Sequence, residues 1–343
     1  MWLMNSLSPI VLPLLYWYSF HKRDLAWRVN ISPYKTWVSE IMLQQTRVET
    51  VKDYFARFMR RLPTIFDLAT IEEDELLKLW EGLGYYNRVR NMQKMARIVV
   101  EKYHGEIPAN YDELIQLPGI GDYTAGAILS IAYQQKIPCV DGNVLRVITR
   151  VLGSYEDIGN VKTKNRIKNL LQEILPDEVG DFNQSLMELG ALVCLPNGEP
   201  LCDTCPLRDF CVAHQNNLTE EIPVKTKKIT RKQEDYTVFL ITCQGKIMLE
   251  KRDDKGLLAS LYQLPNRPGI LSEEQVIQEI NKMGLTVHNL KKCSNQKHIF
   301  SHVEWNMVLY KVEVERENNG LFVSEEERIQ NYPLPTAFEK LLK

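Results

Sequence analysis

Two acidic residues stand in patterns that suit acid and base chemistry. Glu40 falls within a predicted helix over residues 33–46, where three- and four-residue steps bring Trp37, Leu43 and Gln44 to neighbouring turns. A carboxyl group held against an indole and an aliphatic side chain loses hydration. We therefore expect its pKa to rise, so that the group stays protonated near neutral pH as a general acid. A solvated helix glutamate has the same spacing, so periodicity alone leaves both interpretations open.

The second acidic residue is Asp141, in the segment VDGNV directly before a predicted apolar helix over residues 144–152. An aspartate in that place accepts hydrogen bonds from the first free N–H groups of the helix, and these favour its ionised form. An ionised carboxylate suits the stabilisation of a cationic intermediate. An ordinary helix cap is the alternative, and the two roles are compatible.

A glycine-rich turn, LPGIG, joins two predicted helices, the second of which begins at residue 122. Gly119 and Gly121 allow a tight connection, because glycine permits positive φ and close approach of the backbone. The free N–H groups at the start of the second helix make an anion site that suits a DNA phosphate. Many helix pairs are joined by Pro-Gly without a ligand, so the turn alone leaves a structural role open.

Four cysteines form one dense cluster with metal-ligand spacing. Seven, two and five residues separate Cys194, Cys202, Cys205 and Cys211. Four thiolates this close predict a single metal centre, and the chemistry allows either zinc or a [4Fe–4S] cluster. The other three of the seven cysteines are scattered, which is typical of buried small hydrophobic residues. An odd count with one tight cluster favours a reducing compartment over a disulfide framework.

The composition limits the kinds of protein that this chain can be. With 343 residues it is long enough for two domains, and its 44% hydrophobic and 25% charged residues indicate a globular protein. The net charge of −2 means that any nucleic-acid site must be local. The apolar residues 1–15 lack a basic segment and a cleavage site and contain two prolines, so we predict neither a signal peptide nor a membrane span.

A helical framework must position these motifs, and a different fold follows it. Ser32 and Pro33 are typical of a helix start. Further helices are predicted over residues 48–62, 64–84, 88–105, 163–175 and 182–194. After a basic linker the apolar period switches to two, which predicts strands over residues 236–242, 246–252 and 298–315, the first two joined at Gln244-Gly245. We predict domains over residues 1–220 and 235–343, with a linker over 221–234.

The segment GLGYYNRVR, residues 82–90, interrupts the helical pattern. Its glycines present Tyr85 next to Arg88 and Arg90, which suits stacking on bases together with phosphate contact. A packed corner between helices is the alternative.

Together, SEIMLQQT around Glu40, LPGIG, VDGNVLRV, the cysteine cluster and FSH at residues 300–302 resemble the helix-hairpin-helix DNA glycosylase superfamily. Lyase members of that superfamily carry a lysine two residues after the second glycine of the hairpin, where this chain has Tyr123, and a tyrosine forms no Schiff base. A tyrosine at this position resembles the pattern of the adenine DNA glycosylase branch. The resemblance implies an all-α helix-hairpin-helix glycosylase domain with a [4Fe–4S] cluster loop, followed by an α+β Nudix-like domain.

The resemblance also implies roles for individual residues. The catalytic set is Glu40, Asp141, Tyr123 and Asn143. Glu40 would protonate adenine, and ionised Asp141 would stabilise the sugar oxocarbenium ion. The residues implied in substrate binding are Arg23, Leu25, Trp27, Arg28, Leu43, Gln45, Tyr85, Gln184, Phe300, Ser301 and His302. Gly119 and Gly121 would bind DNA phosphate, and Cys194, Cys202, Cys205 and Cys211 would hold the iron–sulfur cluster.

The sequence departs from the family pattern in one place. The first cysteine interval has seven residues where the family has six, which predicts a bulged loop and an easier oxidative loss of the cluster. A second prediction concerns the Nudix-like domain. Residues 273–283 lack the Arg-Glu pair and clustered glutamates that hold Mg²⁺ in a Nudix hydrolase, so we expect no pyrophosphohydrolase activity.

The sequence therefore predicts a monofunctional glycosylase that removes adenine opposite 8-oxoguanine or guanine in double-stranded DNA. We expect a monomer without membrane contact, cytoplasmic and nucleoid-associated in a bacterial-type cell. A pyrimidine-directed glycosylase of the same superfamily, or a DNA-damage-binding protein without catalysis, are the alternatives.

Overall fold

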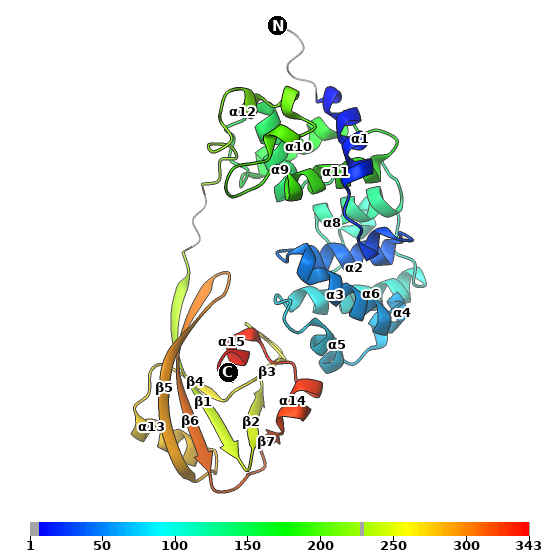
Figure 1. Cartoon of the computed structure of the whole chain (residues 1–343). Coiled ribbons are helices and arrows are strands. Elements are labelled where there is room, and N and C mark those ends of the chain that lie inside the picture. The colour runs from blue at the N-terminus through cyan, green and yellow to red at the C-terminus, as the bar shows by residue number, and fades with distance from the viewer. Residues whose placement is uncertain (1–6, 227–229, 343) are drawn as a thin grey trace. The chain divides into compact units, whose positions relative to one another are not determined.

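The computed structural model describes residues 7–226 and 230–342, shown in Figure 1. They form two compact units. One comprises residues 7–70 and 91–226, and the other comprises residues 71–90 and 230–342. Residues 1–6 of the apolar N-terminal stretch and residues 227–229 of the predicted linker lie outside the described residues.

The first unit is helical. Its longer elements are α1 (Val11–His21), α2 (Pro33–Leu43), α3 (Val48–Arg61), α6 (Asn87–Tyr103), α9 (Gly142–Leu152), α10 (Val161–Gln172) and α11 (Val179–Leu192). Its shorter elements are η1 (Ser8–Ile10), η2 (Ala26–Arg28), α4 (Ile65–Thr70), α7 (Tyr111–Leu114), α8 (Asp122–Ala127), the π-helical turn η3 (Ile128–Ala132), η4 (Cys202–Thr204), η5 (Arg208–Phe210) and α12 (Val212–Gln215).

Local signals explain where these helices begin and end. Ser32 caps α2 as predicted, because its side chain accepts a hydrogen bond from the Lys35 N–H. The predicted helix over residues 64–84 is two helices, α4 and α5 (Glu73–Trp80), because Glu72 between them has an extended backbone with φ −65° and ψ 141°. The acidic first turn of α5 complements the helix dipole.

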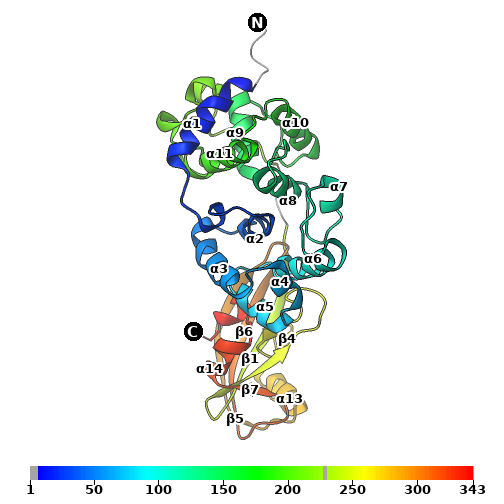
Figure 2. The same ribbon diagram turned by 90° about the vertical axis from the view of Figure 1, so that its right-hand side faces the viewer.

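Helix α11 lies at the centre of one core of the first unit, packed against α1 and α9 (Figure 2). Leu14 and Trp17 from α1, Ile148 from α9, and Phe182 and Leu186 from α11 are buried there. Pro13 does not prevent α1 from forming, since it lies in the first turn, where its missing N–H has no partner within the helix. Within the described part of the chain, no helix is long and apolar enough to cross a membrane.

The second unit contains a mixed sheet in the order β3-β2-β1-β6-β5, with β4 paired to β1 and β7 to β2. Its elements are β1 (Lys232–Cys243), β2 (Lys246–Lys251), β3 (Tyr262–Gln263), β4 (Asn266–Pro268), α13 (Glu273–Lys282), β5 (Val287–Ile299), β6 (Val303–Val314), β7 (Leu321–Val323), α14 (Glu325–Asn331) and α15 (Thr336–Glu339), besides α5. β1 runs parallel to β6 and antiparallel to β2 and β4. Core residues of α13 pack with one cluster of buried sheet residues, and core residues of α15 pack with another, separate cluster.

Two strand predictions have different outcomes. The turn at Gln244-Gly245 between β1 and β2 is confirmed, with positive φ at both residues. The strand region predicted over residues 298–315 is more than one strand, since it contains the end of β5, a turn at residues 300–302 and β6, which pair as an antiparallel hairpin.

Candidate active site

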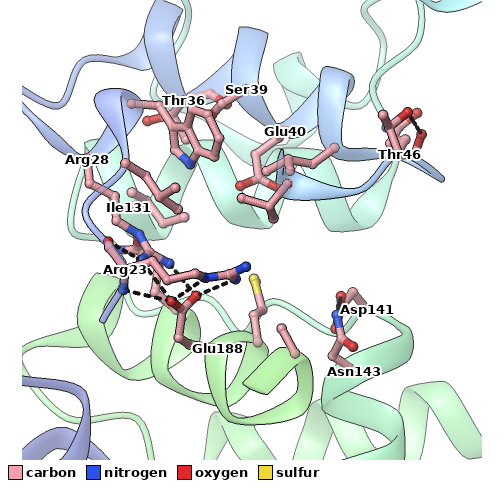
Figure 3. A pocket seen from close by; sticks show the side chains of 18 of the residues that line it. Arg23, Arg28, Thr36, Ser39, Glu40, Thr46, Ile131, Asp141, Asn143 and Glu188 are labelled. Carbon is pink, nitrogen blue, oxygen red and sulfur yellow. Dashed lines mark hydrogen bonds and ion pairs between the residues drawn. The ribbon is translucent and has the colours of Figure 1, made fainter. Parts of the chain in front are cut away.

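A pocket of about 490 Å³ lies in the first unit among α2, α8, η3, α9 and α11 (Figure 3). Eleven residues with a predicted catalytic or substrate-binding role line it: Arg23, Leu25, Trp27, Arg28, Glu40, Leu43, Gln45, Tyr123, Asp141, Asn143 and Gln184. Glu40 and Asp141 are 101 positions apart in the sequence, so the fold brings together two carboxylates whose proximity the sequence did not show.

Glu40 is buried in α2, with 7% of its surface exposed. The Tyr123 hydroxyl donates a 2.6 Å hydrogen bond to Glu40 Oε2. Burial raises the pKa of Glu40 to about 7, and the negative charge of Asp141 adds to the rise, while the hydrogen bond from Tyr123 opposes it. The carboxyl group is therefore poised to hold and release a proton near neutral pH, as expected of a general acid.

Asp141 caps α9 as predicted. Its Oδ1 accepts a 2.8 Å hydrogen bond from the Val144 N–H, and its Oδ2 accepts a 2.8 Å hydrogen bond from Nδ2 of Asn143. Burial nevertheless raises the pKa of Asp141 above its ordinary value, although both hydrogen bonds lower it. The cap thus offsets part of the desolvation and keeps the carboxylate pointed at the pocket in a fixed orientation.

Sequence reasoning missed Glu188, which also lines the pocket from α11. Arg23 and Arg28 both form ion pairs with this carboxylate at 2.8 Å. Burial of Glu188 raises its pKa, but the hydrogen bonds from Arg23 and Arg28 outweigh this and bring the value to about 2. Gln184 precedes Glu188 by one helical turn, and that spacing on one face was the available signal.

Thr36, Ser39, Gln44, Thr46, Val48, Ile131, Gly142, Met187 and Ala191 also line the pocket and were not predicted to do so. Thr36 precedes Glu40 by one turn of α2, so the same spacing rule pointed to it. Both side chains reach the pocket from α2, whereas Asp141 reaches it from the start of α9 (Figure 3).

The four clustered cysteines line one small cavity together with Arg150 and His214. Arg150 Nη1 donates a 3.2 Å hydrogen bond to Cys194 Sγ and a 3.0 Å hydrogen bond to the Leu195 carbonyl. Arg146, one turn earlier on α9, donates through Nε to the Cys194 carbonyl at 2.7 Å. Four thiols around one cavity are the donor type of an iron–sulfur cluster, although among the described residues no three metal-ligating side chains are arranged to hold a metal ion.

The hairpin turn has one glycine with the expected strained backbone. Gly119 has φ +78°, and a Cβ added there would lie 2.9 Å from Cβ of Asn91, so both backbone conformation and space require glycine. Gly121 has φ −108° and open space around the place of a Cβ, so neither its backbone conformation nor the space around it requires glycine. Neither glycine is among the residues that line the pocket.

The remaining predicted residues lie in the second unit. Tyr85 is 48% exposed and has a left-handed backbone with φ +49°, and the Ser301 hydroxyl donates a 3.0 Å hydrogen bond to its hydroxyl. Ser301 lies with Phe300 and His302 between β5 and β6. The Arg88 guanidinium donates hydrogen bonds to the carbonyls of Leu83 and Gly84 and so holds the turn in place. This role agrees with the alternative of a packed corner between helices.

Comparison with known proteins agrees with this geometry. Residues 38–177 match the HhH-GPD superfamily base excision DNA repair proteins, and residues 237–343 match the NUDIX domain. The chain is 34% identical over 338 residues to the adenine DNA glycosylase of Buchnera aphidicola subsp. Baizongia pistaciae, which covers 96% of this chain and 94% of the relative. It is 36% identical over 361 residues to that of Rattus norvegicus, covering 88% and 70%. The chain belongs to the adenine DNA glycosylase family.

Solved structures support the fold of this adenine DNA glycosylase family member. A thermostable thymine-DNA glycosylase is 28% identical, with a TM-score of 0.56 over 61% of this chain and 96% of that one. Endonuclease III bound to DNA has a similar fold at 24% identity, with a TM-score of 0.53 over 61% of this chain and 96% of that one. The predicted fold class, a helix-hairpin-helix glycosylase domain followed by a Nudix-like α+β domain, is confirmed, and so is the assignment to DNA glycosylase enzymes.

Proposed function

We propose that this enzyme hydrolyses the N-glycosidic bond of adenine opposite 8-oxoguanine or guanine in double-stranded DNA. The observation that carries the proposal is that one pocket holds both Glu40, which is buried and has a pKa of about 7, and the half-buried carboxylate of Asp141. Glycoside cleavage uses two carboxyl groups in this way, one as acid and the other as the partner of a positive sugar. A pocket of about 490 Å³ is in the size range of small-ligand sites and suits a base turned out of the duplex.

In the proposed reaction, protonated Glu40 donates its proton to a ring nitrogen of adenine. The base then leaves as a neutral molecule, taking the electron pair of the glycosidic bond. Ionised Asp141 stabilises the oxocarbenium ion, and water adds to the sugar carbon and releases a proton. Asn143 keeps the Asp141 carboxylate oriented through their 2.8 Å hydrogen bond. General acid assistance contributes roughly 10²–10⁴ in rate.

The monofunctional character follows from Tyr123. Its phenol donates a hydrogen bond to Glu40. By the resemblance to the superfamily, lyase members have a lysine amine at this position. A phenol cannot form a Schiff base with the sugar, so water is the proposed nucleophile and no strand cleavage follows.

The residues proposed to enter the duplex share a backbone feature. Gln45 and Tyr85 both have left-handed backbone angles, with φ +58° and +49°, although neither is a glycine. Such strained residues concentrate at functional sites. We assign Gln45 and Tyr85 to the base stack, Gly119 and Gly121 to DNA phosphate, and Phe300, Ser301 and His302 to the base opposite adenine.

Residues 1–220 would then form the glycosylase domain and residues 235–343 a lesion-recognition domain, joined by the linker over residues 221–234, in a protein that acts as a monomer.

We further propose that Cys194, Cys202, Cys205 and Cys211 hold a [4Fe–4S] cluster with a structural role. When bound, the cluster supplies four metal–thiolate attachments that close the loop over α9. Arg150 already bonds one of these thiols. Protein purified anaerobically should be yellow-brown, with about four irons per chain. Stoichiometric zinc without colour would contradict this assignment.

Single-turnover release of the base tests the function. Duplexes with adenine opposite 8-oxoguanine, adenine opposite guanine, and thymine opposite guanine should be compared with enzyme in excess. We expect adenine release from the first two and none of thymine from the third. Glu40→Gln should bind the first duplex but release adenine at least 10²-fold more slowly. Preferential thymine release would favour the pyrimidine-directed alternative, and binding without release by the wild type would favour a damage sensor.

A further inference from the structure

Thr36 presents a buried hydroxyl without a partner at the pocket wall. The residue is 3% exposed, and its Oγ1 has no hydrogen bond within the described part of the chain. Its backbone is fully engaged, because its N–H donates to the Ser32 carbonyl and its carbonyl accepts a 2.9 Å hydrogen bond from the Ser39 hydroxyl. A buried hydroxyl without a partner is costly, so such a group calls for an explanation.

A helical threonine normally avoids this cost by bonding to the carbonyl one turn earlier. Thr149 in α9 shows the ordinary arrangement, since it is fully buried and its Oγ1 donates a 2.7 Å hydrogen bond to the Leu145 carbonyl. Thr36 lies on the pocket lining and makes no such bond. Its hydroxyl oxygen is itself enclosed at the pocket wall, so a group that enters the pocket would reach it when that wall shifts slightly.

The position of Thr36 indicates what that group is. Thr36 lies one turn before Glu40 on α2, and in Figure 3 Asp141 lies on the other side of Glu40 from Thr36. A nucleotide with its sugar at Asp141 and its scissile bond near Glu40 would direct the far side of its base toward Thr36. In adenine, the far side from the glycosidic bond is the six-membered ring, with N1 as an acceptor and the exocyclic amine as a donor.

We propose that the Thr36 hydroxyl completes its hydrogen bonding on the polar edge of the flipped adenine and thereby acts as a specificity-determining residue. The hydroxyl donates to N1 or accepts from the exocyclic amine. This inference rests on the proposed adenine glycosylase function. A base that lacks the matching atom leaves the buried hydroxyl without a hydrogen bond, because no group of the described residues bonds to it. The site therefore discriminates against such a base.

The test combines variants of the residue with analogues of the base and compares their rates of base release. Thr36→Val removes the hydroxyl and keeps the shape, Thr36→Ser keeps the hydroxyl, and Thr149→Val removes a buried hydroxyl that is already bonded away from the pocket. Single-turnover rates are measured with adenine, 1-deazaadenine (no N1) and purine (no exocyclic amine), each opposite 8-oxoguanine. For adenine, Thr36→Val should slow release by about 2- to 12-fold, the net worth of one hydrogen bond, and Thr36→Ser should restore most of the rate.

With the analogue that lacks the partner atom, wild type and Thr36→Val should react at equal rates. Thr36→Val should melt at or above the wild-type temperature, since it removes an unpaired buried group, whereas Thr149→Val should melt lower and keep the wild-type preference among the three bases. Equal slowing on all three bases, no slowing on any, or a folding defect in Thr36→Val would overturn the inference. Failure of the wild type to release adenine at all would instead contradict the proposed function.

Discussion

The hydroxyl of Tyr123 lies 2.6 Å from Oε2 of Glu40 and donates a hydrogen bond to it, joining α8 to α2 across 83 positions of sequence. Burial raises the pKa of Tyr123 well above its usual value, so the phenol remains a donor throughout the range in which Glu40 titrates. The bond fixes one carboxyl oxygen and favours the ionised form. It therefore limits how far burial raises the pKa of the acid.

Replacing Tyr123 with phenylalanine should move the pH dependence of catalysis. The wild-type rate should fall as pH rises through about 7, since Glu40 must be protonated to act as the acid. Loss of the phenol removes an interaction that lowers the pKa of Glu40, so the alkaline limb should shift to higher pH. Single-turnover rates between pH 5 and 9 measure this. Tyr155→Phe, which removes a surface hydrogen bond to Glu221, serves as the control and should leave the limb in place.

The same carboxyl group should make stability depend on pH. The folded-state pKa of about 7 exceeds the ordinary value of 4.5, so between these values the folded protein binds more protons than the unfolded chain. Stability then falls as pH rises through that window, by roughly 3 kcal/mol in total. Glu40→Gln removes the charge, so its advantage over wild type in urea unfolding should be near zero at pH 4.5 and grow toward pH 8. A difference that is constant with pH would contradict a buried, titrating Glu40.

Most of the residues around this pair were predicted from the resemblance to the glycosylase superfamily, and local signals account for where the helices that carry them begin. Ser32 and Pro33 start α2, and Asp141 starts α9. Helical spacing then places Glu40 beside apolar residues, which is consistent with a raised pKa but also with a solvated glutamate, and the burial of Glu40 in the fold decides between them. The meeting of Glu40 with Asp141 was not predictable from these signals, since it depends on how α2, α9 and α11 pack.

Long-range ion pairs were equally hidden. The one-turn spacing from Gln184 pointed to Glu188 but not to its partners Arg23 and Arg28, which are 165 and 160 positions away. In the same way, the arginines of the GLGYYNRVR segment suggested phosphate contact, but Arg88 bonds to carbonyls of its own turn.

Tyr123→Lys should introduce some lyase activity, because it restores an amine at the hairpin position where lyase relatives have one. The new ammonium would lie next to Glu40 and favour its ionised form, so adenine release should slow at the same time. Borohydride trapping measures the covalent adduct with DNA, and we expect trapping by the variant but not by the wild type. Efficient trapping by the wild type would mean that another lysine is the nucleophile and that the enzyme is not monofunctional.

Arg146 should connect the cysteine loop with Asp141, the proposed partner of the oxocarbenium ion. Its Nη2 donates to Asn143 Oδ1 at 2.9 Å and its Nε to the Cys194 carbonyl, while Asn143 bonds to Asp141. Arg146→Gln should therefore lower both the adenine release rate and the retention of iron, and destabilise the protein by about 2 kcal/mol or more. Arg166→Gln, which removes an exposed pair with Glu156, should change none of the three. Normal iron content with reduced activity would show that the link acts on Asp141 alone.

Ser301 should contribute to the choice of the base opposite adenine. Its hydroxyl lies in the turn between β5 and β6 and is bonded to the hydroxyl of Tyr85, a half-exposed residue with a strained backbone. A hydrogen bond that distinguishes the correct base is worth about 1–3 kcal/mol. Ser301→Ala should therefore weaken binding to duplexes with adenine opposite 8-oxoguanine by at least about fivefold, and binding to adenine opposite guanine by less.

The ratio of the two affinities is the decisive quantity for Ser301, since a general loss of folding or DNA binding lowers both. Tyr85→Phe removes the other hydroxyl of the pair and keeps the ring, so it should lower the same ratio if the two hydroxyls act together. The saturating rate of adenine release should stay near the wild-type value in Ser301→Ala, because Glu40 and Asp141 lie in the other unit. An unchanged ratio in Ser301→Ala would mean that the 300–302 turn does not recognise 8-oxoguanine, and that the second unit has a stabilising or partner-binding role.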